Sequence, residues 1–150
     1  MNQNQSALLN VMTAAAIKAG KGLMRDFGEV DQLQISRKGT ANFVTKSDVR
    51  TEKLLHRELS AARPDFGFLL EEGGEIPGKD ETHRFIIDPL DGTSNFIHAI
   101  PYFCISIGVE KRSPQGSEII AGVIYDPIRN DLFTAEQGKG AMLNNRRLSV

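Results

Sequence analysis

The strongest constraint on the fold comes from residues 103–135, where extended segments alternate with turns too short for a crossover. Along the first segment, apolar side chains alternate with small or polar ones in the period of a β-strand, at Phe103, Ile105, Ile107 and Val109. Turns at 113–116 and 126–130 lead into further extended segments at 118–125 and 131–135. Parallel strands need connections of roughly a dozen residues, whereas antiparallel strands can follow one another through tight turns. This stretch therefore predicts an antiparallel meander.

The segment at 118–125 is apolar on both of its faces. One face carries Ile119, Ala121, Val123 and Tyr125, and the other carries Ile120 and Ile124. Such a strand is expected to be covered on both sides. Helices predicted upstream can cover one side, and the cover of the other side is not evident from the sequence.

Two helices are predicted before the strands, because apolar residues recur at three- and four-residue spacing. The first begins at Ser6, its predicted N-cap, and stops before Gly28. The second begins at Ser47 or Asp48, either of which can cap it, and ends at Ala62, shortly before a proline.

The remaining upstream segments are predicted to be loops and short strands. Residues 37–42 form a basic loop, and residues 43–45 approach the second helix in extended form. Short apolar strands are expected at 66–70 and 84–87, with a polar, glycine-rich surface loop at 72–83 between them.

Composition excludes several classes of protein. The 150 residues fit one ordinary domain, and 18 basic against 19 acidic residues give a net charge of −1, which argues against a dedicated nucleic-acid binder. The single cysteine, Cys104, excludes a disulfide framework, and its alternating apolar surroundings predict a core residue. No apolar run approaches the ~20 residues of a membrane span, and the first residues lack signal-peptide features, so a cytoplasmic protein is expected.

Acidic residues follow both short apolar strands. Glu71 comes directly after 66–70, whereas Asp88 and Asp91 come after 84–87. Converging carboxylates repel one another unless a cation lies between them, and oxygen ligands suit a hard ion such as Mg²⁺. Either segment alone would be solvated charge or a turn, but together they indicate a metal site.

The residues after Asp91 are small and polar, reading Gly92-Thr93-Ser94-Asn95. If a short helix begins here, its free amides form an anion site. Metal carboxylates beside such amides describe a site that handles phosphate.

Other acidic motifs are excluded by single residues. An EF-hand loop beginning at Asp88 would need oxygen ligands where Leu90 and Ala99 stand. The aspartyl-phosphate phosphatases place one residue between their two aspartates, whereas Pro89 and Leu90 both intervene here. The histidines do not stand at zinc-site spacings.

Four segments together resemble the inositol monophosphatase family. Residues 85–96, which contain Asp-Pro-Leu-Asp-Gly-Thr, resemble its first signature, and residues 68–72 resemble its upstream metal glutamate. Residues 42–48 resemble its early loop, and residues 137–144 resemble its glycine turn and the hairpin that follows. The resemblance runs through the whole chain in the family's order. The family commonly has Ser where Gly73 stands, which is expected to loosen the segment that carries Glu71.

The resemblance implies two Mg²⁺ positions. Glu71, Asp88 and the backbone carbonyl of Leu90 are the implied ligands of the first, and Asp88 and Asp91 are implied ligands of the second.

The resemblance also implies roles in catalysis and substrate binding. Thr93, paired with Asp48, is expected to orient the attacking water, so Glu71, Thr93 and Asp48 form the implied catalytic set. Asp91 and the amides of Gly92 and Thr93 are expected to hold the substrate.

The implied fold class is α+β, as the N-terminal part of a layered α/β/α/β sandwich with two helices followed by a mainly antiparallel sheet. Residues 1–150 would be the N-terminal part of that domain, because the family's later Trp-Asp motif is missing and the chain has no Trp. That motif supplies another aspartate to the second metal. The chain alone is therefore expected to be nearly inactive, and a homodimer is expected for the full-length form.

The expected reaction is Mg²⁺-dependent hydrolysis of a small phosphomonoester, with inositol monophosphate as the leading substrate. One alternative is a phosphatase for another sugar or nucleotide phosphate. The other is a non-catalytic protein that binds the transcription or RNA-processing machinery, as some bacterial members of the family are thought to do.

Overall fold

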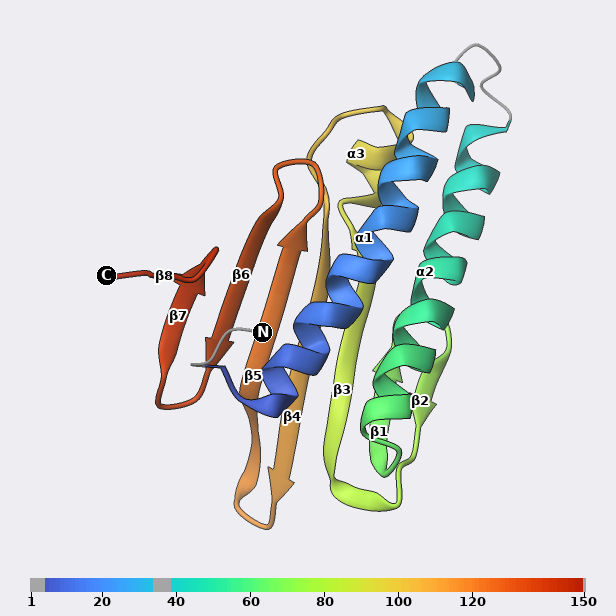
Figure 1. Cartoon of the computed structure of the whole chain (residues 1–150). Coiled ribbons are helices and arrows are strands. Elements are labelled where there is room, and N and C mark those ends of the chain that lie inside the picture. The colour runs from blue at the N-terminus through green and yellow to red at the C-terminus, as the bar shows by residue number, and fades with distance from the viewer. Residues whose placement is uncertain (1–4, 34–38, 150) are drawn as a thin grey trace.

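The computed structural model describes residues 5–33 and 39–149 and places two long helices on one face of a single β-sheet (Figure 1). The helices are α1 (Ala7–Leu33), α2 (Thr40–Ala62) and α3 (Thr93–Ile97). The strands are β1 (Phe66–Leu70), β2 (Gly74–Ile76), β3 (Asp80–Asp91), β4 (Cys104–Ser113), β5 (Gly116–Asp126), β6 (Asp131–Glu136), β7 (Gly140–Leu143) and β8 (Arg146–Arg147). This arrangement confirms the predicted α+β class.

In the described part of the chain the sheet contains eight strands, in the order β2-β1-β3-β4-β5-β6-β7-β8. From β3 to β8 each strand pairs antiparallel with the next along the chain, so the predicted meander is confirmed. Only the pairing of β1 with β3 is parallel among the described strands, and β2 is the connection that makes it possible. This one parallel pair places two strand ends at the same edge of the sheet.

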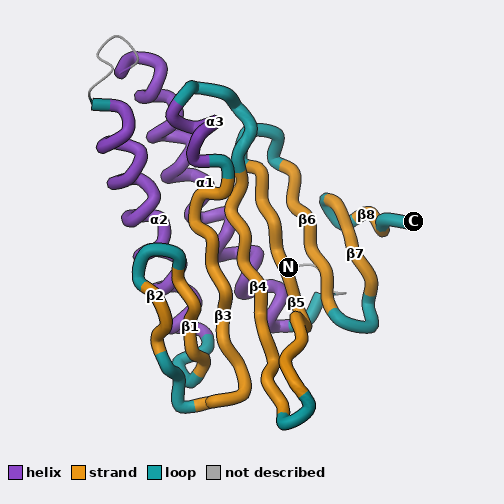
Figure 2. Tube along the Cα trace, turned by 180° about the vertical axis from the view of Figure 1, so that it is seen from behind, coloured by secondary structure: helices purple, strands orange, loops and turns teal. Residues whose placement is uncertain are grey.

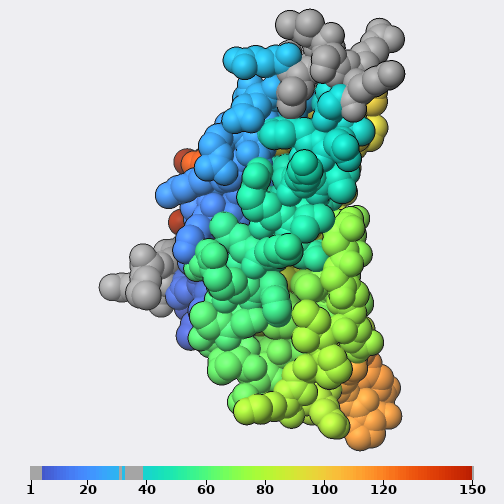
Figure 3. All heavy atoms as spheres, turned by 90° about the vertical axis from the view of Figure 1, so that its right-hand side faces the viewer, coloured from blue at the N-terminus to red at the C-terminus, as the bar shows by residue number. Residues whose placement is uncertain are grey.

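The helices form one layer, and the core lies between that layer and the sheet. Helix α1 crosses β4, β5 and β6, while α2 lies over β1 and β3. Figure 3 shows the outer surface of α2 next to the green and yellow-green surface of the residues that follow it in the chain, which include β1 and β2. The fully buried side chains of this core include Met12, Leu23, Leu55, Leu59, Phe85, Ile105 and Ile107. No helix in the described part of the chain is long and apolar enough to cross a membrane.

The opposite face of the sheet carries no helix among the described elements (Figure 2). Ile124 and Phe133 lie on this face with 45% and 38% of their surface exposed. The strand at 118–125 was expected to be covered on both faces, but the described elements cover only one. Ile119 was expected to share the buried face of Ala121, but it is 57% exposed. A bulge pairs Val109 with Ala121 and the next residue with Ile119, which turns Ile119 away from the core.

Helix α1 is longer than its sequence pattern suggested. Ser6 does cap it, since its hydroxyl accepts the amide hydrogen of Leu9 at 3.1 Å. The expected stop at Gly28 is wrong, because the helix continues to Leu33 and buries Val30 completely. Burial of that next apolar turn outweighs the cost of about 1 kcal/mol of a helical glycine.

Helix α2 begins at Thr40, well before the expected cap. Residues 43–45 are therefore helical rather than extended, and of the expected basic loop 37–42 the first two residues lie outside the described ranges. Ser47 and Asp48 are not caps but buried residues in the helix interior, and the Ser47 hydroxyl donates to Asp26 on α1 at 2.6 Å. Tertiary contacts of these polar residues override their local preference for helix ends.

The expected loop at 72–83 contains β2 and the first residues of β3. Strand β2 is a short edge strand paired with β1, and its glycine-rich sequence has no apolar alternation that would predict it. Pairing with β1 rather than its own side-chain pattern creates this strand.

Candidate functional site

The parallel pairing of β1 with β3 brings the two acidic segments together. Leu70 is in register with Ile87, so the next residues along the two strands, Glu71 and Asp88, lie side by side. The convergence expected from the sequence is therefore present. It depends on a parallel pair within an otherwise antiparallel sheet.

The Glu71 and Asp88 carboxyls act on each other's pKa, and they can hydrogen-bond to one another only when one of the two carries a proton. Partial burial and repulsion from Asp88 raise the pKa of Glu71 from its ordinary 4.5 to about 7. Burial also raises the pKa of Asp88, although its hydrogen bond to Glu71 works in the opposite direction. In the absence of a cation the pair therefore retains a proton near neutral pH.

Helix α2 adds a third carboxyl to this group. Asp48 is only 6% exposed, and its Oδ1 atom is buried without a hydrogen-bond partner among the described residues. Burial, followed by repulsion from Glu72 and Asp88, raises the pKa of Asp48 from 3.8 to about 6. A buried acceptor without a partner is costly, and such an atom is suited to receive a proton donor or a cation.

Strand β3 is irregular where it carries Leu90 and Asp91. Its pairing with β4 shifts register between Asp88 and Asp91, and within this bulge the Leu90 amide donates to Asp88 Oδ1 at 3.2 Å. Repulsion from Asp91 raises the pKa of Asp88, so the two charges act on one another. The bulge thus holds both aspartates and the Leu90 carbonyl at one end of the strand.

A short helix begins directly after Asp91, as expected. Gly92 precedes α3 with a left-handed φ of 93°, and a Cβ atom there would lie 3.1 Å from the Tyr102 carbonyl oxygen. Both the backbone angle and the close approach require glycine.

Thr93 does not form the expected hydrogen bond with Asp48. As the first residue of α3 it turns its hydroxyl back and donates to the Leu90 carbonyl at 3.0 Å. A carbonyl oxygen has two lone pairs, so the Leu90 oxygen retains one for another donor or for a cation. The structure therefore brings Glu71, Asp88 and Asp48 into one cluster and links Thr93 to Leu90.

The donor set fits an oxygen-ligated cation that is not fully enclosed by side chains. In residues 5–33 and 39–149 no three His, Cys, Asp or Glu side chains lie close enough to surround a metal ion by themselves. Mg²⁺ commonly keeps several waters and takes only one or two carboxylates from the protein. Glu71, Asp88 and the Leu90 carbonyl can supply such a partial set, and a bound cation would favour the ionised form of both carboxyls.

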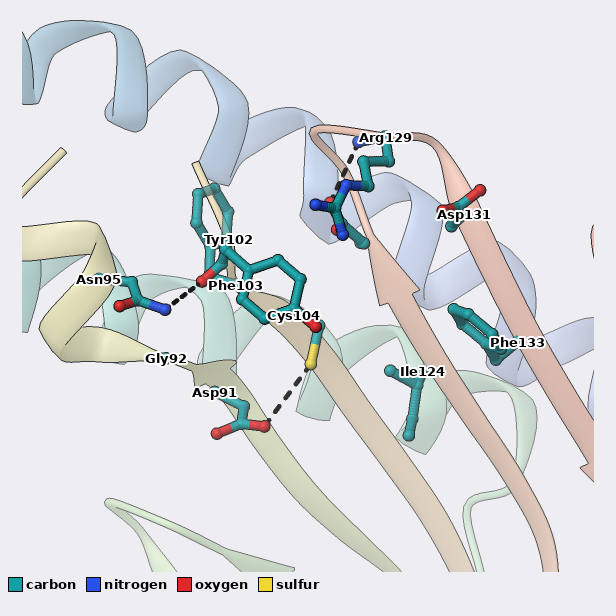
Figure 4. Close-up of a pocket in the computed structure, with 11 residues that line it drawn as sticks. Asp91, Gly92, Asn95, Tyr102, Phe103, Cys104, Ile124, Arg129, Asp131 and Phe133 are labelled. Atoms are coloured by element: carbon teal, nitrogen blue, oxygen red, sulfur yellow. Dashed lines mark hydrogen bonds and ion pairs between the residues drawn. The ribbon is translucent and has the colours of Figure 1, made fainter. Parts of the chain in front are cut away.

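A pocket of about 360 Å³ opens on the other side of Asp91 (Figure 4). The guanidinium of Arg129 lies 4.8 Å from the ring centre of Tyr102 at its rim. Cys104 is half-buried in this pocket rather than a core residue, and its Sγ atom lies 3.7 Å from Asp91 Oδ2. Burial and the neighbouring carboxylates raise the pKa of Cys104 to about 12, which keeps the thiol protonated and unreactive.

Glu52 is a site residue that the sequence reasoning missed. It is buried on α2 one turn after Asp48, and its carboxylate accepts the backbone amides of Glu72 and Gly73 at 2.9 Å each. The spacing of four residues between Asp48 and Glu52, which places two acids on one face of a helix, was the available signal.

Comparisons with known proteins agree with this geometry. The model of the inositol monophosphatase family matches residues 4–150. The inositol-1-monophosphatase of Mesorhizobium japonicum is 54% identical over 146 residues, which cover 97% of this chain and 53% of that protein. The Nus factor SuhB of Vibrio cholerae is 41% identical over 143 residues, covering 95% of this chain and 52% of that protein.

Solved structures show the same likeness. The extragenic suppressor protein suhB from Bartonella henselae superposes with a TM-score of 0.83 at 52% identity, covering 97% of this chain and 54% of that one. The chain thus spans about half the length of the proteins it matches. With a fold, a strand-end carboxyl cluster and a family model that agree along its length, the chain belongs to the inositol monophosphatase family.

Proposed function

We propose that this chain carries the first metal position and the phosphate-binding helix start of a Mg²⁺-dependent phosphomonoesterase. The observation that carries the proposal is the convergence of Glu71 and Asp88 at the ends of β1 and β3 with the buried Asp48, whose Oδ1 atom has no hydrogen-bond partner among the described residues. Carboxyls that raise one another's pKa in this way are typical of a site built for a cation.

The residues divide the work of phosphate ester hydrolysis. Glu71, Asp88 and the Leu90 carbonyl would hold Mg²⁺, which when bound makes a water more acidic and stabilises charge on the leaving oxygen. Thr93, held by the Leu90 carbonyl, would direct its hydroxyl oxygen toward the attacking water. The amides of Gly92 and Thr93 would bind the phosphate oxygens, and Asp91 would contact the alcohol.

Inositol monophosphate is the proposed substrate. Support comes from the name inositol-1-monophosphatase for the relative from Mesorhizobium japonicum at 54% identity. The match covers 53% of that relative, and the unmatched part can also contribute to the choice of substrate. A substrate panel must therefore include other sugar and nucleotide phosphates as alternatives.

A chimera tests the proposal. Residues 1–150 are joined to the part of the Mesorhizobium protein that lies beyond the match, and phosphate release is measured with and without Mg²⁺. We expect Mg²⁺-dependent release from inositol monophosphate, and we expect Asp88→Asn to abolish it while circular dichroism and the unfolding midpoint stay unchanged. No release from any phosphomonoester, or full activity of Asp88→Asn, would contradict the proposal.

A second candidate function is binding to the transcription machinery without catalysis. It is favoured by the Nus factor SuhB relative at 41% identity. Affinity purification with the unmodified chain and with Asp88→Asn separates the two functions. Identical transcription partners for both, together with no phosphatase activity in the chimera, would favour the binding role.

We also propose that the full assembly is a cytoplasmic homodimer, as the family resemblance implies. Sedimentation of the chimera at micromolar concentration tests the dimer, and a monomeric species at the highest concentration would contradict it.

A further inference from the structure

We propose that Glu52 is a positioning residue that fixes the turn carrying Glu71 and so sets the cation affinity of the first metal position. The inference rests on the proposed function, since it assigns Glu71 as a ligand. It concerns a residue that would not touch the cation itself.

The geometry of the Glu52 carboxylate supports this role. Its Oε2 atom accepts the amide of Glu72 and its Oε1 atom accepts the amide of Gly73, both at 2.9 Å. The side chain is 5% exposed, and no ion pair with a cation in the described ranges accounts for its burial. The two amides are therefore the partners that make a buried carboxylate tolerable here.

The turn itself is shaped around this anion. Leu70 pairs with Gly74 across β1 and β2, which leaves Glu71, Glu72 and Gly73 as the connecting turn. A Cβ atom at Gly73 would lie 3.3 Å from Glu52 Oε1 and 2.8 Å from Leu70 Cδ1, so the turn packs closely onto the carboxylate. Consecutive amides pointing at one anion form a nest, and removing the anion removes what orients them. The carboxylate thus offsets the looseness expected of Gly73.

Glu71 is covalently tied to the group that Glu52 holds. The amide that donates to Oε2 belongs to the planar Glu71–Glu72 peptide, so a carboxylate that holds this peptide restricts the backbone rotation next to Glu71 and thereby the direction of its side chain. Asp48 lies one turn earlier on the same face of α2 and is also buried. A single helix therefore positions one site carboxyl directly and a second through the turn.

The test compares Glu52→Gln with Glu58→Gln in this chain. Glu58 is an acidic residue of the same helix that pairs with Lys18 at the surface, so its variant controls for loss of a carboxylate from α2. Three quantities are measured: Mn²⁺ affinity by titration calorimetry, hydrogen exchange of the Glu72 and Gly73 amides without metal, and the urea unfolding midpoint.

For Glu52→Gln we expect Mn²⁺ affinity to fall by roughly 10–100-fold, as is typical when a group that orients a metal ligand is lost. The two amides should exchange faster. A glutamine side chain has only one acceptor oxygen, so its NH2 group would stand opposite one of the two backbone amides and could not accept its hydrogen. Glu58→Gln should change neither quantity. If Glu52→Gln fails to fold, Glu52→Asp is used instead. It keeps the charge but moves the carboxylate away from the turn by about one methylene, so weaker Mn²⁺ binding and faster exchange of the two amides are again expected.

Unchanged Mn²⁺ affinity in a folded Glu52 variant would overturn the proposal, even if the amides exchanged faster. An equal gain in exchange rate across the whole sheet would also overturn it, since that pattern marks a purely structural role. If the unmodified chain binds no Mn²⁺, the proposed function is contradicted instead, and the exchange rates then decide whether Glu52 holds the turn.

Discussion

At the scale of single residues, the site is governed by carboxyls that hold protons at a higher pH than ordinary carboxyls do. Burial and repulsion from Asp88 raise the pKa of Glu71, and the buried Asp48 has an oxygen without a hydrogen-bond partner among the described residues. A cation and a proton therefore compete for the same oxygens. This competition gives a test of the metal site that does not depend on catalysis.

Stability of the metal-free chain should fall as pH rises from about 4 to 7. The pKa of Glu71 is raised to about 7 and that of Asp48 to about 6, so the folded state binds more protons than the unfolded state in this window. The contribution is complete below the unfolded pKa values and is lost above the folded ones. Urea unfolding midpoints across the window measure the effect.

Mg²⁺ supplies the control for that experiment. Added Mg²⁺ should raise the unfolding midpoint at about pH 8, where the protons are gone, and have little effect at about pH 5. Asp88→Asn should flatten the pH dependence because it removes a repelling charge from Glu71. Stability that rises through the window would contradict this account.

Loss of the Thr93 hydroxyl should act on turnover rather than binding. In the chimera, Thr93→Ala is expected to lower kcat by roughly 10²–10⁴-fold, the usual effect of losing a positioned proton-transfer group. Thr93→Ser should recover most of the rate because it keeps the bond to the Leu90 carbonyl. Ser94→Ala, at the exposed next residue of α3, is the matched control. A change confined to KM would assign Thr93 to phosphate binding instead.

At the scale of elements, α3 is held by an aromatic cluster behind the site. Phe27 of α1 packs edge-to-face on Phe96 of α3 with ring centres 5.4 Å apart, and Phe103 contacts both rings. Phe96 is completely buried. The start of α3 is thus fixed from the core side, while Gly92 allows the chain to turn into it.

Gly92→Ala should therefore cost more than a left-handed backbone alone explains. An L-residue at a positive φ costs about 1–2 kcal/mol, and here the added Cβ would also press on the Tyr102 carbonyl. Gly138 has a φ of 77° with nothing near its Cβ position, so Gly138→Ala isolates the backbone cost. We expect a larger drop in unfolding free energy for Gly92→Ala. Equal losses in urea titrations would show that the close approach is relieved by movement of the loop.

The elements that could be predicted from sequence are those in which the spacing of apolar residues along the chain matches the residues that are buried in the structure. The meander from Phe103 onward alternates regularly except at the bulge before Ile119, and Ser6 caps α1 through the amide of Leu9 in the same turn. The start of α2 and strand β2 could not be found this way, because contacts with other elements decide them. For the same reason the bond of Thr93 to Leu90 and the bonds of Glu52 to the turn after β1 could not be predicted, although the spacing of Asp48 and Glu52 already placed both on one face of α2.

At the scale of the whole molecule, one face of the sheet is covered and the other is open. The open face carries exposed Ile124 and Phe133 beside the pocket next to Asp91. The relatives are about twice as long as this chain. We expect the chimera, which adds the rest of the Mesorhizobium protein, to contain a fuller second metal position and a fuller surface for the alcohol than residues 1–150 do.

The chain by itself should accordingly be nearly inactive. Asp88 and Asp91 supply only part of a second metal position, and loss of one electrostatic stabiliser typically costs 10²–10³-fold in rate. We expect phosphate release by residues 1–150 to fall below that of the chimera by at least roughly that factor. Equal rates per mole would show that this chain already contains everything the reaction needs.

The order of elements along the chain has a consequence for how the molecule is made. The groups of the site come from α2, β1, β3 and α3, a continuous stretch from residue 40 to residue 97. By contrast, α1 is synthesised first but packs on strands near the other end, where Gly20 lies against Tyr125 so closely that a Cβ would fall 2.5 Å from its ring. Because such distant contacts form late, we expect α1 to pack first on α2 and to dock on the sheet only once β5 has emerged from the ribosome, after the site segment is already complete.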